Sequence, residues 1–182
     1  GEARGGRRTP DHQEEMGADT SGILCSPAWK TIAKMRFLAG DYHTKKQQVL
    51  RVDQEPDRIP DREELLQLEA KVRRDLDGVD AWVVSDYGYG VVSPEIIELM
   101  RGEAARGKVV VADSRYRVRD FTGVTLVTPN EMELFHAYGM EQTGPEGPND
   151  RLLLDAGRRL LDDLRSQAVL VTRGNRGMML FE

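Results

Sequence analysis

From residue 61 onward, the chain alternates short apolar runs with segments of helical periodicity, and this alternation restricts its fold more than any other feature. Apolar runs stand at 81–85, 109–112, 124–127, 168–172 and 178–181. Runs of this length, separated by helical patterns, are typical of buried strands joined by crossover helices. We therefore expect an α/β fold with a mostly parallel sheet.

The segments between these runs carry helix signals. Asp61 and Glu64 have the spacing of an N-cap pair. An apolar stripe with helical spacing follows them, at Leu65, Leu68, Val72 and Leu76. Ser93 predicts the start of a second helix and Asn130 that of a short third one, and a fourth is expected over 150–166.

The first sixty residues follow a different pattern. Residues 1–16 are rich in Gly, Arg and Glu, and we interpret them as a poorly ordered leader. Two short runs, 31–38 and 47–52, are joined by a polar stretch. They predict a β-hairpin or a pair of lid strands within 29–53.

Composition excludes several classes of protein. The 39% apolar and 31% charged residues are typical of a globular domain. The net charge of -5, with no basic run longer than a pair such as Arg7 and Arg8, argues against general binding to nucleic acid or anionic membrane. Cys25 is the one cysteine, so an internal disulfide and a cysteine-cluster zinc site are excluded; we expect it to be packed in a loop. No apolar run approaches the roughly 20 residues of a membrane span. These features favour a cytoplasmic protein.

Polar and glycine residues gather where the expected strands end. The corresponding loops are 86–90, 113–115, 128–133 and 172–174. Ligands of doubly wound α/β folds bind outside the carboxyl ends of the strands, so these loops are the first place to look for a site. Neither a GxxxxGK[ST] nor a GxGxxG motif is present, which leaves a P-loop or dinucleotide site without a motif.

Taken in order, these segments resemble the PfkB or ribokinase-like carbohydrate kinases, and more narrowly the heptose-phosphate kinase branch, the kinase half of ADP-heptose synthases. The matching stretches are 17–22 (GADTSG), 31–40 (TIAKMRFLAG), 47–53 (QQVLRVD), 84–90 (VSDYGYG), 111–115 (VADSR), 128–133 (TPNEME) and 171–178 (VTRGNRGM). On this resemblance, 17–182 is part of a PfkB-type kinase domain, with lid-like strands at 29–53 and an α/β core at 61–182. The resemblance implies a three-layer sandwich with a small β lid, ATP and Mg²⁺ as cosubstrates, and phosphoryl transfer to a sugar or sugar phosphate.

The resemblance also implies residues on the nucleotide side. Asn130 and Glu133 match the family's NxxE motif, which acts through Mg²⁺ and its waters. Thr172 and Gly174 match its Thr-x-Gly segment near the ATP phosphates. Each pair has a purely structural alternative. Asn130 and Glu133 have the spacing of a capping box, and Gly174 with Asn175 suits a tight turn with positive φ.

Five further residues are candidates on the substrate side. Lys34, Arg36 and Arg51 lie in the lid-like strands, where cations suit a sugar phosphate, and Asp113 with Arg115 follows an expected strand. The alternative for the three lid cations is a solvated strand face, and for Asp113 and Arg115 a surface salt bridge.

The family pattern is not complete in these 182 residues. An N-terminal sugar-binding segment and the GAGD segment are absent from them. In the family, GAGD supplies the anion hole and the catalytic base, so we expect the base beyond Glu182 and no phosphoryl transfer by this chain alone. We also expect exposed strand edges and apolar surface.

Other functions remain open. One alternative is a non-catalytic binding or assembly module that forms a homodimer through the lid strands. A nucleotidyltransferase domain has less support, because no HxGH-like motif appears.

Overall fold

The computed structural model describes residues 13–40, 47–140 and 150–182. The chain divides into two compact units, Gly1–Leu68 and Glu69–Glu182. Most of the expected leader lies outside the described residues, and 13–15 form a helical turn. No helix in the described part of the chain has the length and hydrophobicity needed to cross a bilayer.

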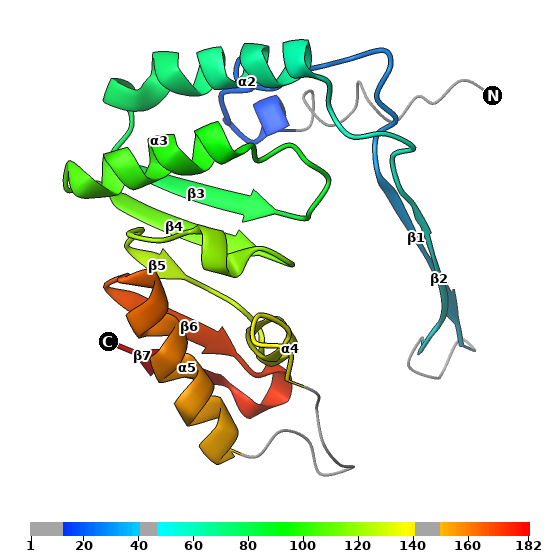
Figure 1. Ribbon diagram of the computed structural model, residues 1–182. Coiled ribbons are helices and arrows are strands. Elements are labelled where there is room, and N and C mark those ends of the chain that lie inside the picture. The colour runs from blue at the N-terminus through cyan, green and yellow to red at the C-terminus, as the bar shows by residue number, and fades with distance from the viewer. Residues whose placement is uncertain (1–12, 41–46, 141–149) are drawn as a thin grey trace. The chain divides into compact units, whose positions relative to one another are not determined.

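The first unit contains the two expected lid-like strands. β1 (Ala33–Ala39) pairs antiparallel with β2 (Gln47–Gln54), as Figure 1 shows. The register shifts between Phe37 and Leu38. Apart from Ala33, every residue of the two strands is exposed. Cys25 is also exposed, not packed as the sequence led us to expect.

Helix α2 (Arg62–Asp75) begins as its capping sequence predicts. The Glu64 amide donates to Asp61 Oδ1 at 2.9 Å, and the Asp61 amide donates to Glu64 Oε2 at 3.0 Å. The expected apolar stripe is only half-buried. The buried residue of this helix is instead Glu69, which accepts a 2.9 Å hydrogen bond from Ser93 Oγ. A short 3-10 turn, η1 (Leu76–Gly78), follows.

The second unit is built on a five-stranded sheet of order β3-β4-β5-β6-β7 (Figure 1). Its strands are β3 (Ala81–Asp86), β4 (Val109–Ser114), β5 (Leu126–Val127), β6 (Ala168–Thr172) and β7 (Met178–Phe181). The first four are parallel and β7 is antiparallel to β6, which confirms the mostly parallel sheet. β5 is shorter than the expected run 124–127.

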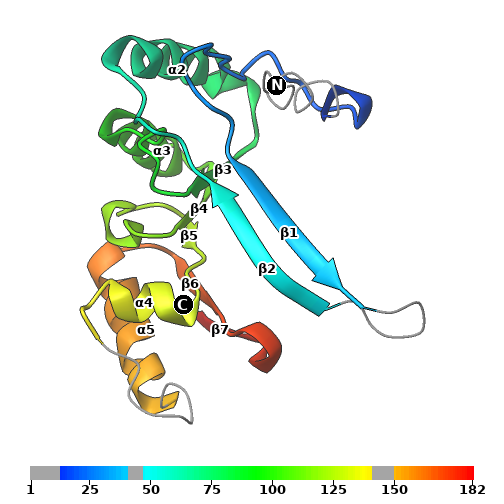
Figure 2. The same ribbon diagram turned by 90° about the vertical axis from the view of Figure 1, so that its right-hand side faces the viewer.

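Three helices and two 3-10 turns connect these strands. They are α3 (Pro94–Ala105), η2 (Val118–Asp120), α4 (Glu131–His136), α5 (Asp150–Leu164) and η3 (Gly174–Arg176). α3 and α5 lie on one face of the sheet (Figures 1 and 2). Most of the core between helices and sheet is apolar, with Met100, Val110, Leu134, Leu153, Leu160, Val169 and Val171 at most 1% exposed.

The opposite face of the sheet carries exposed apolar side chains. Val83 is 77% exposed, Leu180 54% and Val109 49%. Side chains alternate between the two faces of a strand, so each strand buries one set of residues and exposes the other. The described part of this unit therefore forms two layers of the expected sandwich, and the expected exposed apolar surface is present.

Candidate functional site

The parallel strands bring the four polar loops to one edge of the sheet. β3, β4, β5 and β6 all run in the same direction, so the residues that follow them lie at the same edge (Figure 1). The register sets Asp86 beside Ser114 and Ser85 beside Asp113. This is the carboxyl edge, where ligands of such folds bind.

Backbone contacts join the two segments assigned to the nucleotide side. The Thr172 amide donates to the Pro129 carbonyl oxygen at 2.9 Å. Asn130 and Thr172 form an isolated parallel bridge just beyond the ends of β5 and β6. The NxxE segment and the Thr-x-Gly segment are therefore neighbours, although Asn130 and Thr172 are 42 residues apart in the sequence.

Asn130 and Glu133 form the complete capping box of α4. Asn130 Oδ1 accepts from the Glu133 amide, and Glu133 Oε2 accepts from the Asn130 amide, both at 2.9 Å. A carboxylate has about four lone-pair sites, so this bond uses only part of the acceptor capacity of Glu133. The capping geometry is present, and it is compatible with a second role toward a hydrated cation.

Charges from two strand ends meet around Glu133. Its pKa is raised chiefly by burial and further by the nearby Asp113 carboxylate, while Arg115 acts to lower it. Thr128 Oγ1 lies 3.5 Å from Asp113 Oδ1, a long contact between the loops that follow β4 and β5. Asp113 and Arg115, which the sequence placed on the substrate side, thus lie close enough to act on the NxxE carboxylate.

The turn after β6 leaves its main chain exposed at Gly174. Gly174 has φ of +58°, and a Cβ built on it would meet nothing within 4 Å. The second residue with positive φ in this turn is Gly177, not the expected Asn175. The Arg173 amide donates to the Gly177 carbonyl oxygen at 2.9 Å and closes the turn. An exposed turn of this kind lets a ligand approach the main chain.

Asp86 holds the loop after β3 from a buried position. Its side chain is 2% exposed and accepts from Ser114 Oγ at 2.9 Å and from Arg117 NH2 at 2.9 Å. Its other oxygen accepts from the Gly88 amide at 3.0 Å. This last bond is the local contact that an aspartate makes in a turn at the end of a strand. The partnership with Arg117 has no local sequence signal.

A second ion-pair cluster was also not predicted from the sequence. Glu131, the first residue of α4, accepts from Arg173 Nε at 2.7 Å and also from Arg176 NH2. Arg173 donates in addition to Asp150 at the start of α5. The side chains of Glu131 and Arg173 are only 10% and 11% exposed.

The lid cations share one face of the β1–β2 ribbon. Lys34 lies opposite Asp53, and Arg36 lies opposite Arg51. Arg51 also forms a 3.0 Å ion pair with Asp53. Three cations and one carboxylate give this face an excess of positive charge. Directly opposed like charges destabilise a strand pair, and a bound anion would relieve the repulsion between Arg36 and Arg51.

An open cavity of about 440 Å³ lies beside the loop after β4. Its walls come from that loop and from the end of α4: Tyr116, Arg117, Arg119, Asp120, His136 and Ala137. None of these is a candidate from the sequence. The described residues contain no cluster of three or more His, Cys, Asp or Glu side chains able to hold a metal.

Comparisons with known proteins agree with the α/β architecture described above. No family model matches the chain. The bifunctional protein HldE of Paramagnetospirillum magneticum is 37% identical over 99% of this chain and 35% of its own length. The chain spans about a third of the length of the curated relatives it matches.

Solved structures support the fold. Phosphofructokinase-2 from Escherichia coli, in complex with fructose-6-phosphate, aligns with a TM-score of 0.53 at 18% identity, over 76% of this chain and 44% of that one. Adenosine kinase from Anopheles gambiae also aligns with a TM-score of 0.53 at 18% identity, over 86% and 47%. Nearly the whole chain is thus homologous to part of the bifunctional HldE proteins, and its fold is ribokinase-like, as in these two kinases.

Proposed function

We propose that this chain is part of an ATP-dependent kinase that transfers the γ-phosphoryl group to a hydroxyl of a sugar or sugar phosphate, with a heptose phosphate as the substrate class. The observation that carries the proposal is the bridge between Asn130 and Thr172. It joins the two motifs assigned to the nucleotide side at the carboxyl edge of one parallel sheet.

On the nucleotide side, Thr172 and Gly174 offer a hydroxyl and an approachable backbone to the phosphates. Asn130 and Glu133 would hold Mg²⁺ through its waters. Their hard oxygen atoms suit this cation, and a water-mediated site needs no cluster of direct protein ligands. Magnesium would supply charge neutralisation for the phosphates. Burial and Asp113 disfavour the charged form of Glu133, so a nearby cation would stabilise its carboxylate.

On the substrate side, Lys34, Arg36 and Arg51 form the cationic face of the lid-like ribbon. Arginine presents a planar fork that matches phosphate, and lysine adds a point charge. We assign the phosphate of the sugar to this face. Asp113 and Arg115 are assigned to the substrate side of the carboxyl edge.

The 182 residues contain no GAGD segment, so the base and anion hole of the family have no counterpart in them. Each such element is typically worth about 10²-fold or more in rate. We therefore expect this chain alone to bind Mg-ATP without measurable turnover.

Isothermal titration with Mg-ATP, beside a coupled ADP-release assay with heptose 7-phosphate, tests the proposal. Saturable binding at one site, abolished by EDTA, supports it. ADP release that depends on the sugar would support the kinase assignment and overturn the expected inactivity. Absence of both signals, with the chain shown to be folded by circular dichroism, would contradict the assignment.

A second candidate function, assembly through the lid, rests on the other face of the ribbon. Met35 lies opposite Val52, and Phe37 lies opposite Leu50. These four side chains are 47%, 40%, 49% and 53% exposed in the same order. An exposed apolar strip of this kind suits a homodimer. Light scattering of Phe37→Lys, with Arg36→Ala on the cationic face as the control, separates the two faces.

A further inference from the structure

The cluster around Glu131 joins the same two segments as the Asn130–Thr172 bridge. Glu131 follows Asn130 directly and Arg173 follows Thr172 directly. The backbone bridge pairs the first residue of each dipeptide, and the 2.7 Å ion pair joins the second. The two loops are thus connected by a main-chain contact and by a side-chain ion pair.

The side-chain contact extends this connection to a third element. Arg173 donates to Asp150 as well as to Glu131, and it therefore reaches the start of α5. Arg176 approaches Glu131 from the far end of the same turn. Hydrogen bonding to Glu131 is the main cause of the raised pKa of Arg173, so the guanidinium stays charged.

Such a cluster is poorly explained by stability alone. Desolvation of nearly buried charges offsets much of their attraction, and apolar side chains of similar volume often stabilise a protein equally well. Charged groups do give a unique geometry, because they leave only a few satisfied arrangements.

We propose that Glu131 and Arg173 are positioning residues, whose ion pair sets the NxxE segment in register with the Thr-x-Gly turn so that both act on one nucleotide. The inference rests on the proposed function for its ligand. Neither residue needs to touch the nucleotide. In the proposed site Thr172 and Gly174 meet the nucleotide, Asn130 and Glu133 act through hydrated Mg²⁺, and the ion pair fixes the relative placement of the two segments.

Removal of the charge of Glu131 tests this proposal, because two explanations predict opposite changes in nucleotide affinity. Glu131→Gln removes a negative charge near the proposed phosphate site. If Glu131 acted only through its electric field, the anionic nucleotide would bind this variant more tightly. If Glu131 positions the two loops, Glu131→Gln binds Mg-ADP more weakly, by about tenfold.

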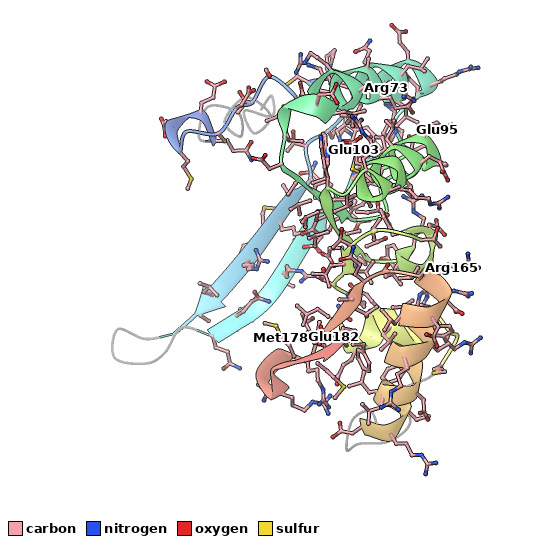
Figure 3. All side chains as sticks on the ribbon, turned by 90° about the vertical axis from the view of Figure 1, so that its left-hand side faces the viewer. Arg73, Glu95, Glu103, Arg165, Met178 and Glu182 are labelled. Carbon is pink, nitrogen blue, oxygen red and sulfur yellow. The ribbon has the colours of Figure 1, made fainter. Side chains whose placement is uncertain are left out.

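Glu103 provides a matched control. Its side chain is 3% exposed and pairs with Arg106 at 2.9 Å and Lys108 at 2.8 Å, so it too is a buried carboxylate between two cations. It lies on α3 (Figure 3), and Lys108 precedes β4 at the other edge of the sheet. Glu103→Gln should therefore lower stability without changing Mg-ADP affinity.

The experiment compares the whole chain with Glu131→Gln, Arg173→Met, their double variant and Glu103→Gln. Titration with Mg-ADP gives affinity, and NMR-detected hydrogen exchange of the Thr172 amide reports on its bond to Pro129. We expect weaker binding and about tenfold faster exchange in both single variants, with a double variant little worse than either. Arg173→Lys should recover part of the affinity.

Each other outcome has a defined meaning. Unchanged or tighter binding by Glu131→Gln overturns the proposal, and so does a loss of affinity no larger than in Glu103→Gln. If the wild-type chain itself does not bind Mg-ADP, the proposed function fails. Hydrogen exchange of the Thr172 amide then tests the positioning role by itself. If this amide exchanges no faster in Glu131→Gln than in Glu103→Gln, the positioning role is contradicted.

Discussion

Asp86 and Arg117 are joined by two hydrogen bonds, from Nε at 3.2 Å and from NH2 at 2.9 Å, to a single carboxylate oxygen. The Asp86 side chain is 2% exposed, whereas the Arg117 side chain is 32% exposed. Arg117 also donates to the Val92 carbonyl oxygen at 2.7 Å and so ties the end of β3 to the approach to α3. Removal of the arginine would leave Asp86 as a buried charge without its cation.

Arg117→Met should therefore lower the free energy of unfolding by about 3 kcal/mol, because breaking one side of a buried pair leaves the other side uncompensated. Urea denaturation measures the change. Arg119→Met is the matched control, since Arg119 is 53% exposed and 3.8 Å from its partner Asp163. It should change stability by less than about 1 kcal/mol. Equal losses in the two variants would contradict this role for Asp86.

Two capping boxes in the described part of the chain offer a test of the NxxE assignment. Asp61 with Glu64 and Asn130 with Glu133 make the same pair of reciprocal bonds. Asn130→Ala and Asp61→Ala should each cost about 1 kcal/mol of stability. Only Asn130→Ala should weaken Mg-ATP binding, by about tenfold or more, in isothermal titration. If both variants bind Mg-ATP equally well, the capping alternative is sufficient for Asn130.

Two helix glycines should respond to alanine with opposite signs. A Cβ on Gly157 of α5 would lie 2.2 Å from Cζ of the buried Phe181, whereas a Cβ on Gly102 of α3 meets nothing within 4 Å. Gly102→Ala should stabilise by about 1 kcal/mol through helix propensity. Gly157→Ala should destabilise by about 1–3 kcal/mol through overpacking. Thermal unfolding distinguishes them, and a stabilised Gly157→Ala would show that α5 does not need this close approach to β7.

Acid should weaken the contact between Arg58 and Glu64. Hydrogen bonding to Arg58, followed by that to Ser26, lowers the pKa of Glu64 to about 2 from an ordinary value of 4.5. A carboxyl whose pKa is depressed by folding stabilises the fold fully above pH 4.5, and this contribution is lost as the pH falls toward about 2. Carboxyl NMR titration of Glu64 should show the low pKa. The stability difference between wild type and Glu64→Gln should shrink from pH 6 to pH 3, and a constant difference would contradict the assignment.

Local features could be predicted because their physical causes lie within a few residues. The caps at Asp61, Ser93 and Asn130 depend on hydrogen bonds to amides three residues away, and all three are present. The strands were predicted with small errors at their ends for the same reason, since each is a short apolar run between polar loops. The order of these segments was also enough to indicate the family.

Burial was harder to predict from the same runs. The apolar run 81–85 suggested a buried parallel strand, yet Val83 is 77% exposed while Val84 is 7% exposed. The run specifies a strand, but the layers that pack against it decide which of its faces is covered.

The sequence by itself determined the elements, their caps and the motifs that indicate a kinase, because propensity, capping and periodicity act over short distances along the chain. Only the tertiary structure decided that Asp86 pairs with Arg117, 31 residues away, and that Glu131 pairs with Arg173, 42 residues away. These partners meet because the strand order places β4 beside β3 and β6 beside β5. That order results from packing of the whole sheet, which no short stretch of sequence contains.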